Sequence, residues 1–267
     1  MGNKIGYLNI ASSLGLTGNE VLFVSADLTR LAFQCAKNKT PFNVQLFIQS
    51  FIDELPNGTL IIPTYTDDLV GGMSFDVKKS KPNIGALAVA AFKNKTAFRT
   101  SDPFHSMAVW GVHVPLFESI TDKHTFGADS AFALLHQLKA KMVMIDLTLN
   151  QNFTFLHYCE EFANVSWRKL VKHKIKMVNE DGGFVEDDFW FFTRKVGFTN
   201  ALNPLEKILL DEKLITEYKI GGVSVKMLEF SPVFDRIVMD IAQNKGRSFS
   251  QFTLYEWLRA IKNKFIK

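Results

Sequence analysis

The sequence predicts an α/β fold in which a mixed central sheet lies between layers of helices. Over the first two thirds of the chain, short apolar runs alternate with stretches in which apolar residues recur at helical spacing. This alternation is typical of α/β domains, whose strands are buried between helices. In the last third, polar and apolar residues alternate along the chain, as in strands with one exposed face.

The elements of the first two thirds follow from these patterns in order. Strands are predicted over residues 21–24, 59–62, 108–112 and 141–145. Helices are predicted over residues 42–55, 84–92 and 129–138. The segment Pro56-Asn57-Gly58 ends the first of these helices, and Asp129 or Ser130 can cap the third.

The C-terminal third has a different texture. Residues 167–177 and 218–226 read as half-exposed strands, and residues 180–188 as an acidic loop containing glycines. Helices are predicted over residues 203–212 and 231–243, the second with Ser231 before Pro232 in its first turn. Because no linker or repeat interrupts the sequence, residues 1–267 are expected to form a single domain. No role is predicted for the tail, residues 243–267.

Composition narrows the class of protein. The 267 residues are 47% hydrophobic and include 25 phenylalanines, so a large aromatic core is expected. The net charge of +4 is mild, and no zinc-finger or RNA-recognition spacing accompanies it, which argues against nucleic acid. Two cysteines, Cys35 and Cys159, do not make a disulfide framework, and no Cys/His cluster indicates a metal. Neither a membrane-length apolar run nor a signal pattern is present, so a cytoplasmic protein is expected.

The segment 152–160 carries the most chemistry, because it places His157 three residues before Glu160. If it opens a helix after the strand at 141–145, both side chains share one face at the end of a sheet, where α/β folds place their sites. A histidine beside a carboxylate is a candidate general base, since its pKa lies near neutrality and the acid can orient the ring. The alternative is an ordinary pair on a helix surface.

Further segments, spread in order over roughly residues 14–242, resemble the aminoglycoside 3-N-acetyltransferase (antibiotic N-acetyltransferase) family. The resemblance rests on Leu14-Gly15-Leu16-Thr17-Gly18, Val24-Ser25-Ala26-Asp27-Leu28, Gly58-Thr59-Leu60-Ile61-Ile62-Pro63-Thr64, Ser74-Phe75-Asp76, Ile84-Gly85-Ala86-Leu87, Arg99-Thr100-Ser101-Asp102-Pro103-Phe104-His105-Ser106, Phe126-Gly127-Ala128-Asp129-Ser130, the His157–Glu160 segment and Asp187-Asp188-Phe189. It implies acetyl-CoA as the donor, an amine as the acceptor and direct transfer without an acyl-enzyme. It also implies that roughly residues 165–242 form an extension on the acceptor side of the cleft.

The resemblance implies roles for individual residues. His157 is expected to be the general base and Glu160 its partner, with no metal involved. A buried, inert thiol is expected at Cys159. Contacts to CoA are expected from Asp27, Leu28, Pro63, Thr64, Arg99, Ser101 and Ser106. Contacts to the acceptor amine are expected from the acidic residues Asp67, Asp187 and Asp188, and the resemblance supports Asp187 or Asp188 among them.

Three positions depart from the family's pattern. Asp102 replaces a histidine before proline, Asp27 adds an acid where the family carries hydroxyls, and Asp146 replaces a frequent glycine. The resemblance therefore implies a divergent member. The mildly basic chain favours an anionic acceptor, such as a nucleotide-linked amino sugar, because a cleft for polycationic aminoglycosides should be acidic. An aminoglycoside acceptor, or a non-catalytic CoA or sugar binder, remains the alternative.

Overall fold

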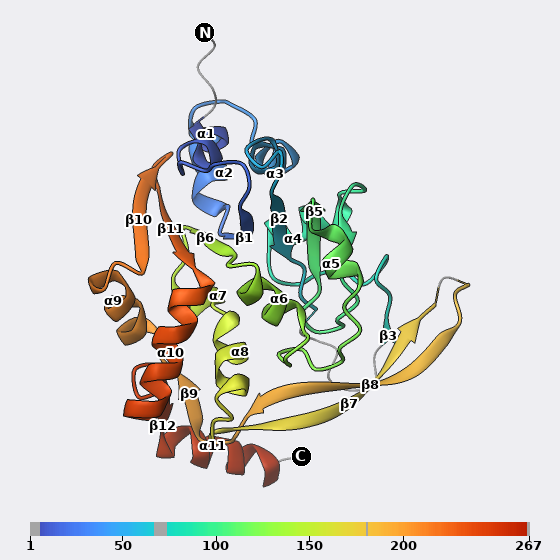
Figure 1. The fold of residues 1–267 in the computed structure, drawn as a ribbon, viewed down its shortest axis with the longest axis vertical. Coiled ribbons are helices and arrows are strands. Elements are labelled where there is room, and N and C mark those ends of the chain that lie inside the picture. The colour runs from blue at the N-terminus through green and yellow to red at the C-terminus, as the bar shows by residue number, and fades with distance from the viewer. Residues whose placement is uncertain (1–5, 67–73, 180, 266–267) are drawn as a thin grey trace.

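A central sheet with helices on both faces dominates the molecule (Figure 1). The computed structural model describes residues 6–66, 74–179 and 181–265. The expected α/β class with a mixed sheet is confirmed, and the predicted strands at residues 21–24, 59–62, 108–112 and 141–145 all form within it.

The seven strands run in the order β10-β11-β6-β1-β2-β5-β4. Their bounds are β1 Val21–Ala26, β2 Thr59–Pro63, β4 Phe98–Arg99, β5 Met107–Gly111, β6 Lys141–Ile145, β10 Ile215–Ile220 and β11 Val223–Glu229. The three central strands β6, β1 and β2 are parallel, and the outer neighbours pair antiparallel. The carboxyl ends of the parallel strands therefore lie at one edge of the sheet, which is the usual place for a site in such folds.

Each face of the sheet has its own buried core. The first face is covered by η1 Gly6–Leu8, α1 Asn9–Ser12, α2 Thr29–Lys37, α3 Val44–Asp53 and α4 Ala86–Lys93. The second is covered by α5 Val114–Glu118, α6 Ala131–Gln137, α7 Leu149–Asn152, α8 Phe155–Phe162, α9 Asn203–Asp211 and α10 Phe230–Asn244. The second core is rich in aromatic rings: Phe155 stacks on Phe230 with ring centroids 4.1 Å apart. Among the described helices, none has the length and apolar character needed to cross a bilayer.

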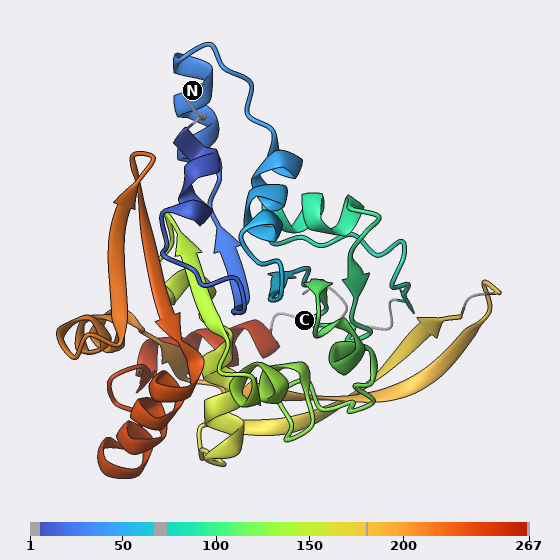
Figure 2. The same ribbon diagram turned by 45° about the horizontal axis from the view of Figure 1, so that its top comes forward.

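A long hairpin of β7 Arg168–Val178 and β8 Phe184–Arg194 reaches away from the helices, with β3 Ser74–Phe75 beside it (Figures 1 and 2). A small core of four buried residues, Phe75, Phe104, Ile175 and Phe189, fixes the hairpin to the loop after β4. The hairpin thus forms one wall beside the helices of the second face.

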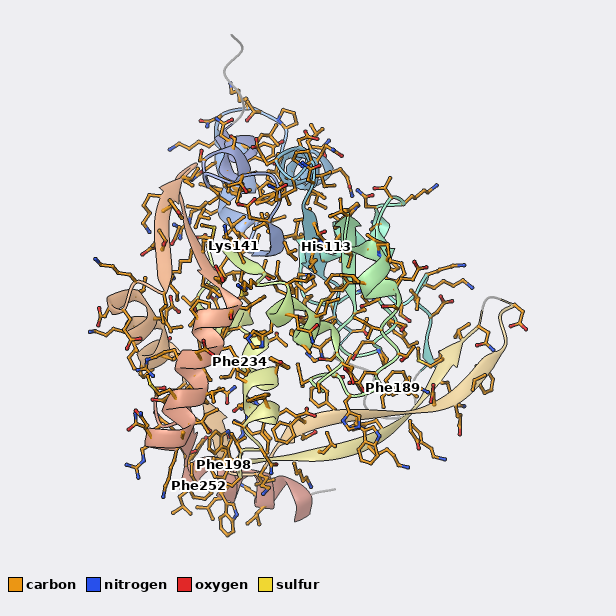
Figure 3. All side chains as sticks on the ribbon, viewed as in Figure 1. His113, Lys141, Phe189, Phe198, Phe234 and Phe252 are labelled. Atoms are coloured by element: carbon orange, nitrogen blue, oxygen red, sulfur yellow. The ribbon has the colours of Figure 1, made fainter. Side chains whose placement is uncertain are left out.

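The C-terminal tail packs near the strand that follows the β7–β8 hairpin. Strand β12 Ser250–Phe252 pairs with β9 Phe198–Asn200, and α11 Leu254–Phe265 follows it. Phe198 and Phe252 lie side by side, with ring centroids 5.4 Å apart (Figure 3). The tail is therefore packed against the end of the β7–β8 hairpin region.

Several predicted elements are wrong in their limits. Residues 218–226 are not one strand: Gly221 and Gly222, with φ of +60° and +77°, turn the chain between β10 and β11. The predicted acidic loop over 180–188 ends early, because β8 begins at Phe184. Helix α10 begins at Phe230, one residue before Ser231, and Ser231 does not cap it. Part of the expected acceptor-side extension, namely β10 and β11, instead completes the central sheet.

Asp146 follows β6 with a φ of +55°, in the left-handed region that favours glycine. The backbone N–H of Asp146 donates to the carbonyl of Ser224 at 2.7 Å, and its carboxylate pairs with Arg30 at 3.2 Å. These contacts hold Asp146 in a backbone conformation that usually favours glycine.

Candidate active site

The pair of His157 and Glu160 lies on α8, as its spacing predicts. His157 Nδ1 and Glu160 Oε2 are 2.9 Å apart, a hydrogen-bonding distance. The helix begins at Phe155, and its apolar residues bury one side of it against α6 and α10. Residues three apart on such a helix share a face.

Glu160 is fully buried, and three groups converge on its carboxylate. Oε1 accepts a hydrogen bond from Trp167 Nε1 at 2.7 Å, and Oε2 lies 2.5 Å from Arg168 Nε in addition to the contact with His157. Burial pushes the pKa of Glu160 up, but the hydrogen bond from His157 and the charge of Arg168 outweigh it, so the pKa lies below its usual value. Glu160 is therefore an ionised carboxylate inside the protein.

The ring of His157 is fixed on one side and open on the other. Glu160 occupies Nδ1, and 20% of the His157 side chain is exposed. Burial and the charge of Arg168 lower the pKa of His157, against the opposing effect of Glu160. The imidazole is consequently neutral at pH 7, and within the described part of the chain Nε2 has no hydrogen-bond partner that would stop it from taking a proton.

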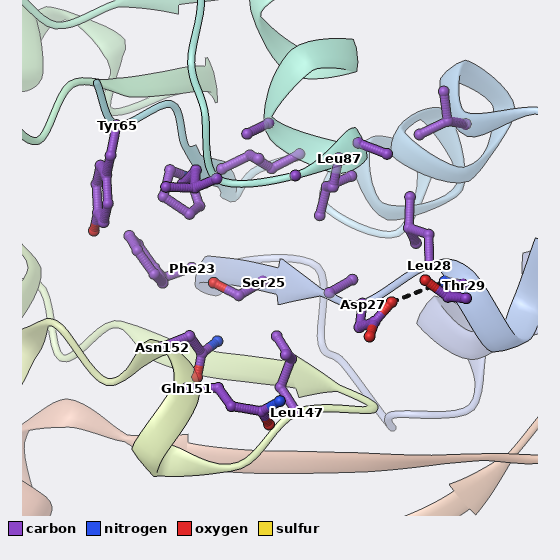
Figure 4. A pocket seen from close by; sticks show the side chains of 18 of the residues that line it. Phe23, Ser25, Asp27, Leu28, Thr29, Tyr65, Leu87, Leu147, Gln151 and Asn152 are labelled. Carbon is purple, nitrogen blue, oxygen red and sulfur yellow. Dashed lines mark hydrogen bonds between the residues drawn. The ribbon is translucent and has the colours of Figure 1, made fainter. Parts of the chain in front are cut away.

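A pocket of about 690 Å³ opens at the carboxyl ends of β1 and β2 (Figure 4). Asp27, Leu28 and Thr29 line one end, and Phe23, Tyr65 and Asn152 lie toward the other (Figure 4). Of the sequence-predicted donor residues, Asp27, Leu28 and Pro63 line this pocket. Among the described lining residues Asp27 is the only carboxylate, and no lysine or arginine is present. An apolar pocket of this size with a few polar groups suits a long amide-bearing chain better than phosphates.

His157 does not itself line the large pocket, but its neighbours do. Asn152 and Thr154, which precede it on the chain, line the pocket, as does His105. The ring of Phe126 lies between the two histidines, with centroids 5.2 Å from His105 and 5.4 Å from His157. Phe126 thus contacts both the proposed base, His157, and a residue of the pocket wall, His105.

A second pocket of about 330 Å³ shares one described lining residue with the first, His105. Its wall combines carboxylates with basic residues. The carboxylates are Asp102, Glu118, Asp122 and Asp187, and the basic residues besides His105 are Lys123 and His124. The smaller pocket is therefore acidic in balance.

Three of the predicted CoA contacts, Thr64, Arg99 and Ser106, form a buried network instead of lining the large pocket. Arg99 donates to Thr64 Oγ1 and Ser106 Oγ, and to the carbonyl oxygens of Thr64, Val77 and Ser80 at 2.7–3.0 Å. Burial lowers the pKa of Arg99 to about 10, so it keeps its charge at pH 7. Its donors are engaged with the backbone, and this is the geometry of a structural residue.

We expect Arg99→Lys to lower the free energy of unfolding by about 2 kcal/mol, because a lysine cannot make the same set of charged hydrogen bonds. Urea denaturation measures this loss. Arg30→Lys is the matched control, since the Arg30 side chain is 60% exposed and forms a surface ion pair with Asp146. A CoA dissociation constant raised tenfold with unchanged stability would instead return Arg99 to the donor site.

The predicted acceptor contacts lie elsewhere. Asp187 pairs with Lys123 and lines the smaller pocket, whereas Asp188 pairs with Lys172 at 2.8 Å on the exposed hairpin and lines neither pocket. Ser101 lines the smaller pocket, away from the predicted donor contacts at Asp27 and Leu28. Asp67 lies outside the described residues.

Cys159 lies on the face of α8 that is turned into the core. Its side chain is fully buried, and burial raises the pKa of its thiol well above the usual value. A buried thiol of this kind is a poor nucleophile. Within residues 6–66, 74–179 and 181–265, no three His, Cys, Asp or Glu side chains group as a metal site requires.

Sequence reasoning missed the importance of two residues. His105, which lies three residues after Asp102, was given no role, yet it lines both pockets. Asn152 lines the large pocket with both Oδ1 and Nδ2 buried and without a hydrogen-bond partner in the described structure. Its position as the first residue of the segment 152–160 is the signal that could have found it.

Comparison with known proteins places the chain. A model of the aminoglycoside 3-N-acetyltransferase family matches residues 23–240. The chain belongs to this family. Aminoglycoside 3-N-acetyltransferases are acetyl-CoA-dependent enzymes, and the chain is an acyltransferase of the N-acetyltransferase class. A comparison with curated proteins gives no match.

Solved structures share the fold at low sequence identity. The aminoglycoside acetyltransferase AAC(3)-Xa superposes with a TM-score of 0.74 at 18% identity, over 90% of this chain and 93% of that one. AAC-IIIb in its binary complex with CoASH gives 0.72 at 16% identity, over 89% and 95%. AAC-VIa bound to sisomicin gives 0.71 at 15% identity, over 90% and 96%. At these identities the comparisons show that the chain shares its fold with the three enzymes.

Proposed function

We propose that the enzyme transfers an acetyl group from acetyl-CoA directly to the amine of an amino sugar, with His157 as general base. The observation that carries this proposal is the 2.9 Å contact between His157 Nδ1 and the buried carboxylate of Glu160. The contact fixes the ring and leaves Nε2 for the substrate, while burial and the charge of Arg168 lower the pKa of His157 and keep the imidazole neutral at pH 7. An amine must lose a proton to attack a thioester, and a fixed neutral imidazole can accept it.

The large pocket is the proposed site of the pantetheine arm. Its apolar walls suit the arm's methylene groups, and Asn152 offers a donor and an acceptor that match an amide. Asp27, Leu28 and Pro63 would border the arm nearer the mouth. The structure of AAC-IIIb with CoASH supports the choice of donor.

Direct transfer fits the surroundings of the base better than an acyl-enzyme. The amine nitrogen forms a bond to the carbonyl carbon, and the bond from that carbon to sulfur then breaks. The proton passes from the amine to His157 Nε2 and then to the departing thiolate. Cys159, the nearest thiol in the sequence, is buried with a raised pKa and does not line either pocket.

Two acceptor classes compete. A nucleotide-linked or glycan-building amino sugar is favoured by the net charge of +4. A polycationic aminoglycoside is favoured by the carboxylates of the smaller pocket and by AAC-VIa, which binds sisomicin. The charge of one pocket bears more directly on a ligand than the charge of the whole chain.

Mass spectrometry of products formed from acetyl-CoA with a panel of both amine classes tests the proposal. A mass gain of one acetyl group on an amino sugar supports it. Acetylation confined to kanamycin-like amines would select the second candidate. CoA binding by calorimetry without turnover of any amine would instead indicate a non-catalytic binder.

The pH dependence of kcat/KM should show the base. Because His157 acts in its neutral form and its pKa is lowered from 6.5, activity should fall toward acid with a midpoint below pH 6.5. Initial rates between pH 4.5 and 8 measure this limb, and His157→Gln is the control in which it should vanish. An acid limb centred above 6.5, or one that persists in His157→Gln, would contradict the assignment.

A further inference from the structure

His105 belongs to the walls of both pockets, although the residue is only 8% exposed. A ligand in either pocket therefore lies next to this residue. If the arm of acetyl-CoA fills the large pocket, its thioester at the inner end comes near His105.

Aromatic neighbours hold the His105 ring in place. The ring of Tyr65 meets it edge-on with centroids 4.4 Å apart, and Phe191 lies parallel to it at 5.5 Å with an angle of 12°. Phe126 packs at 5.2 Å. The backbone N–H of His105 donates to Asp102 Oδ1 at 2.7 Å, which fixes the turn that carries it. The aromatic packing and the fixed turn therefore preorganise the ring.

The two ring nitrogens of His105 differ in their surroundings. Nδ1 is buried and has no hydrogen-bond partner within the described part of the chain. Buried N–H groups without partners are rare, so the proton is best placed on Nε2, with Nδ1 carrying only its lone pair. Nε2 is then the nitrogen that can reach a ligand in the pocket.

Burial lowers the pKa of His105 to about 3, with a smaller contribution from His157. The imidazole is therefore neutral throughout the physiological range and keeps one N–H. A group with so low a pKa is a poor base, but it can donate a hydrogen bond without needing to be charged. The two imidazoles therefore differ in their surroundings. His157 Nδ1 contacts the carboxylate of Glu160, whereas His105 Nδ1 has no hydrogen-bond partner among the described residues.

We propose that His105 is a catalytic residue that donates Nε2–H to the thioester carbonyl oxygen and holds the oxyanion of the tetrahedral intermediate. This inference rests on the proposed function. Attack of the amine moves the carbonyl π pair onto oxygen, which accepts the hydrogen bond, and expulsion of the thiolate returns that pair. His105 keeps its proton throughout, and His157 carries the transferred one. A fixed donor aimed at the developing charge stabilises the transition state more than the substrate.

Three variants test the proposal, with CoA affinity measured beside steady-state kinetics. We expect His105→Ala and His105→Asn to lower kcat about 10²- to 10³-fold, as loss of one oxyanion donor does. The CoA dissociation constant by calorimetry should stay within about twofold of the wild type, since this hydrogen bond forms chiefly in the transition state. His105→Gln should recover at least about tenfold in kcat over His105→Asn, because its amide nitrogen falls near the Nε2 position. The acid limb of the pH profile should not move.

A matched control is His113→Ala, which removes an imidazole that hydrogen-bonds Thr59 Oγ1 at 2.9 Å beside β5 and lines neither pocket (Figure 3). Circular dichroism confirms that each variant folds, and if His105→Ala does not, the glutamine and asparagine pair carries the comparison. Unchanged kcat in His105→Ala, or equal losses in the glutamine and asparagine variants, would overturn the proposal. Failure of the wild type to acetylate any amine would overturn the proposed function instead, so the two failures are distinguishable.

Discussion

Replacing His157 by alanine is expected to lower kcat by about 10²- to 10⁴-fold, the usual contribution of a positioned general base. The physical reason is that the attacking amine is then left to lose its proton to water, without a fixed acceptor beside the thioester. Steady-state kinetics with saturating acetyl-CoA and the best amine of the panel measure the loss. The KM for acetyl-CoA should change little, because the imidazole does not line the large pocket.

Added imidazole gives this prediction a sharp control. If the His157→Ala variant leaves a space beside Phe126, free imidazole should restore part of the rate, with a dependence on pH that follows its own titration. His136→Gln serves as a matched variant, because His136 contacts Tyr158 and Phe234 on α10's side of the core and lines neither pocket. A His157→Ala enzyme with the wild-type kcat would exclude the imidazole as the base.

Local patterns were enough to predict most of the sheet and the spacing of the site. The strand at 141–145 and the helix that carries His157 follow from apolar runs and periodicity, because burial on one face imposes these patterns directly. The hairpin at Gly221-Gly222 was missed, since alternation of polar and apolar residues looks the same on either side of a tight turn. The predicted limits of the strands were least accurate in the C-terminal third, where the strands are half-exposed.

Contacts between distant segments could not be predicted in this way. The position of the His105 ring depends on Phe191, which lies on the β7–β8 hairpin, and on Tyr65, which follows β2. Arg99 was expected to contact CoA because its segment resembles the family's pattern, but in the structure it donates hydrogen bonds to the carbonyl oxygens of Val77 and Ser80. Such outcomes are decided by the tertiary packing, which a single sequence does not contain.

The second large effect is expected on stability, from Glu160→Ala. Removing the carboxylate leaves the guanidinium of Arg168, a residue only 5% exposed, without its counter-charge and leaves Trp167 Nε1 without its acceptor. Breaking a buried ion pair from one side costs about 3–5 kcal/mol. Urea denaturation at pH 7 measures the loss. Glu217→Ala is the control: its side chain is 35% exposed and pairs with the exposed Lys219, so its loss should stay under about 1 kcal/mol.

Glu160→Gln separates the charge from the shape of this residue. The pKa of Glu160 in the folded protein lies below the ordinary 4.5, because His157 and Arg168 favour the ionised form more than burial opposes it. Its charge therefore stabilises the fold above pH 4.5, and that contribution is lost as the pH falls through the lower folded value. The difference in unfolding free energy between the wild type and Glu160→Gln should shrink as the pH falls below 4.5. A difference that does not change with pH would mean that Arg168 does not depend on the carboxylate's charge, and that packing alone holds His157 in position.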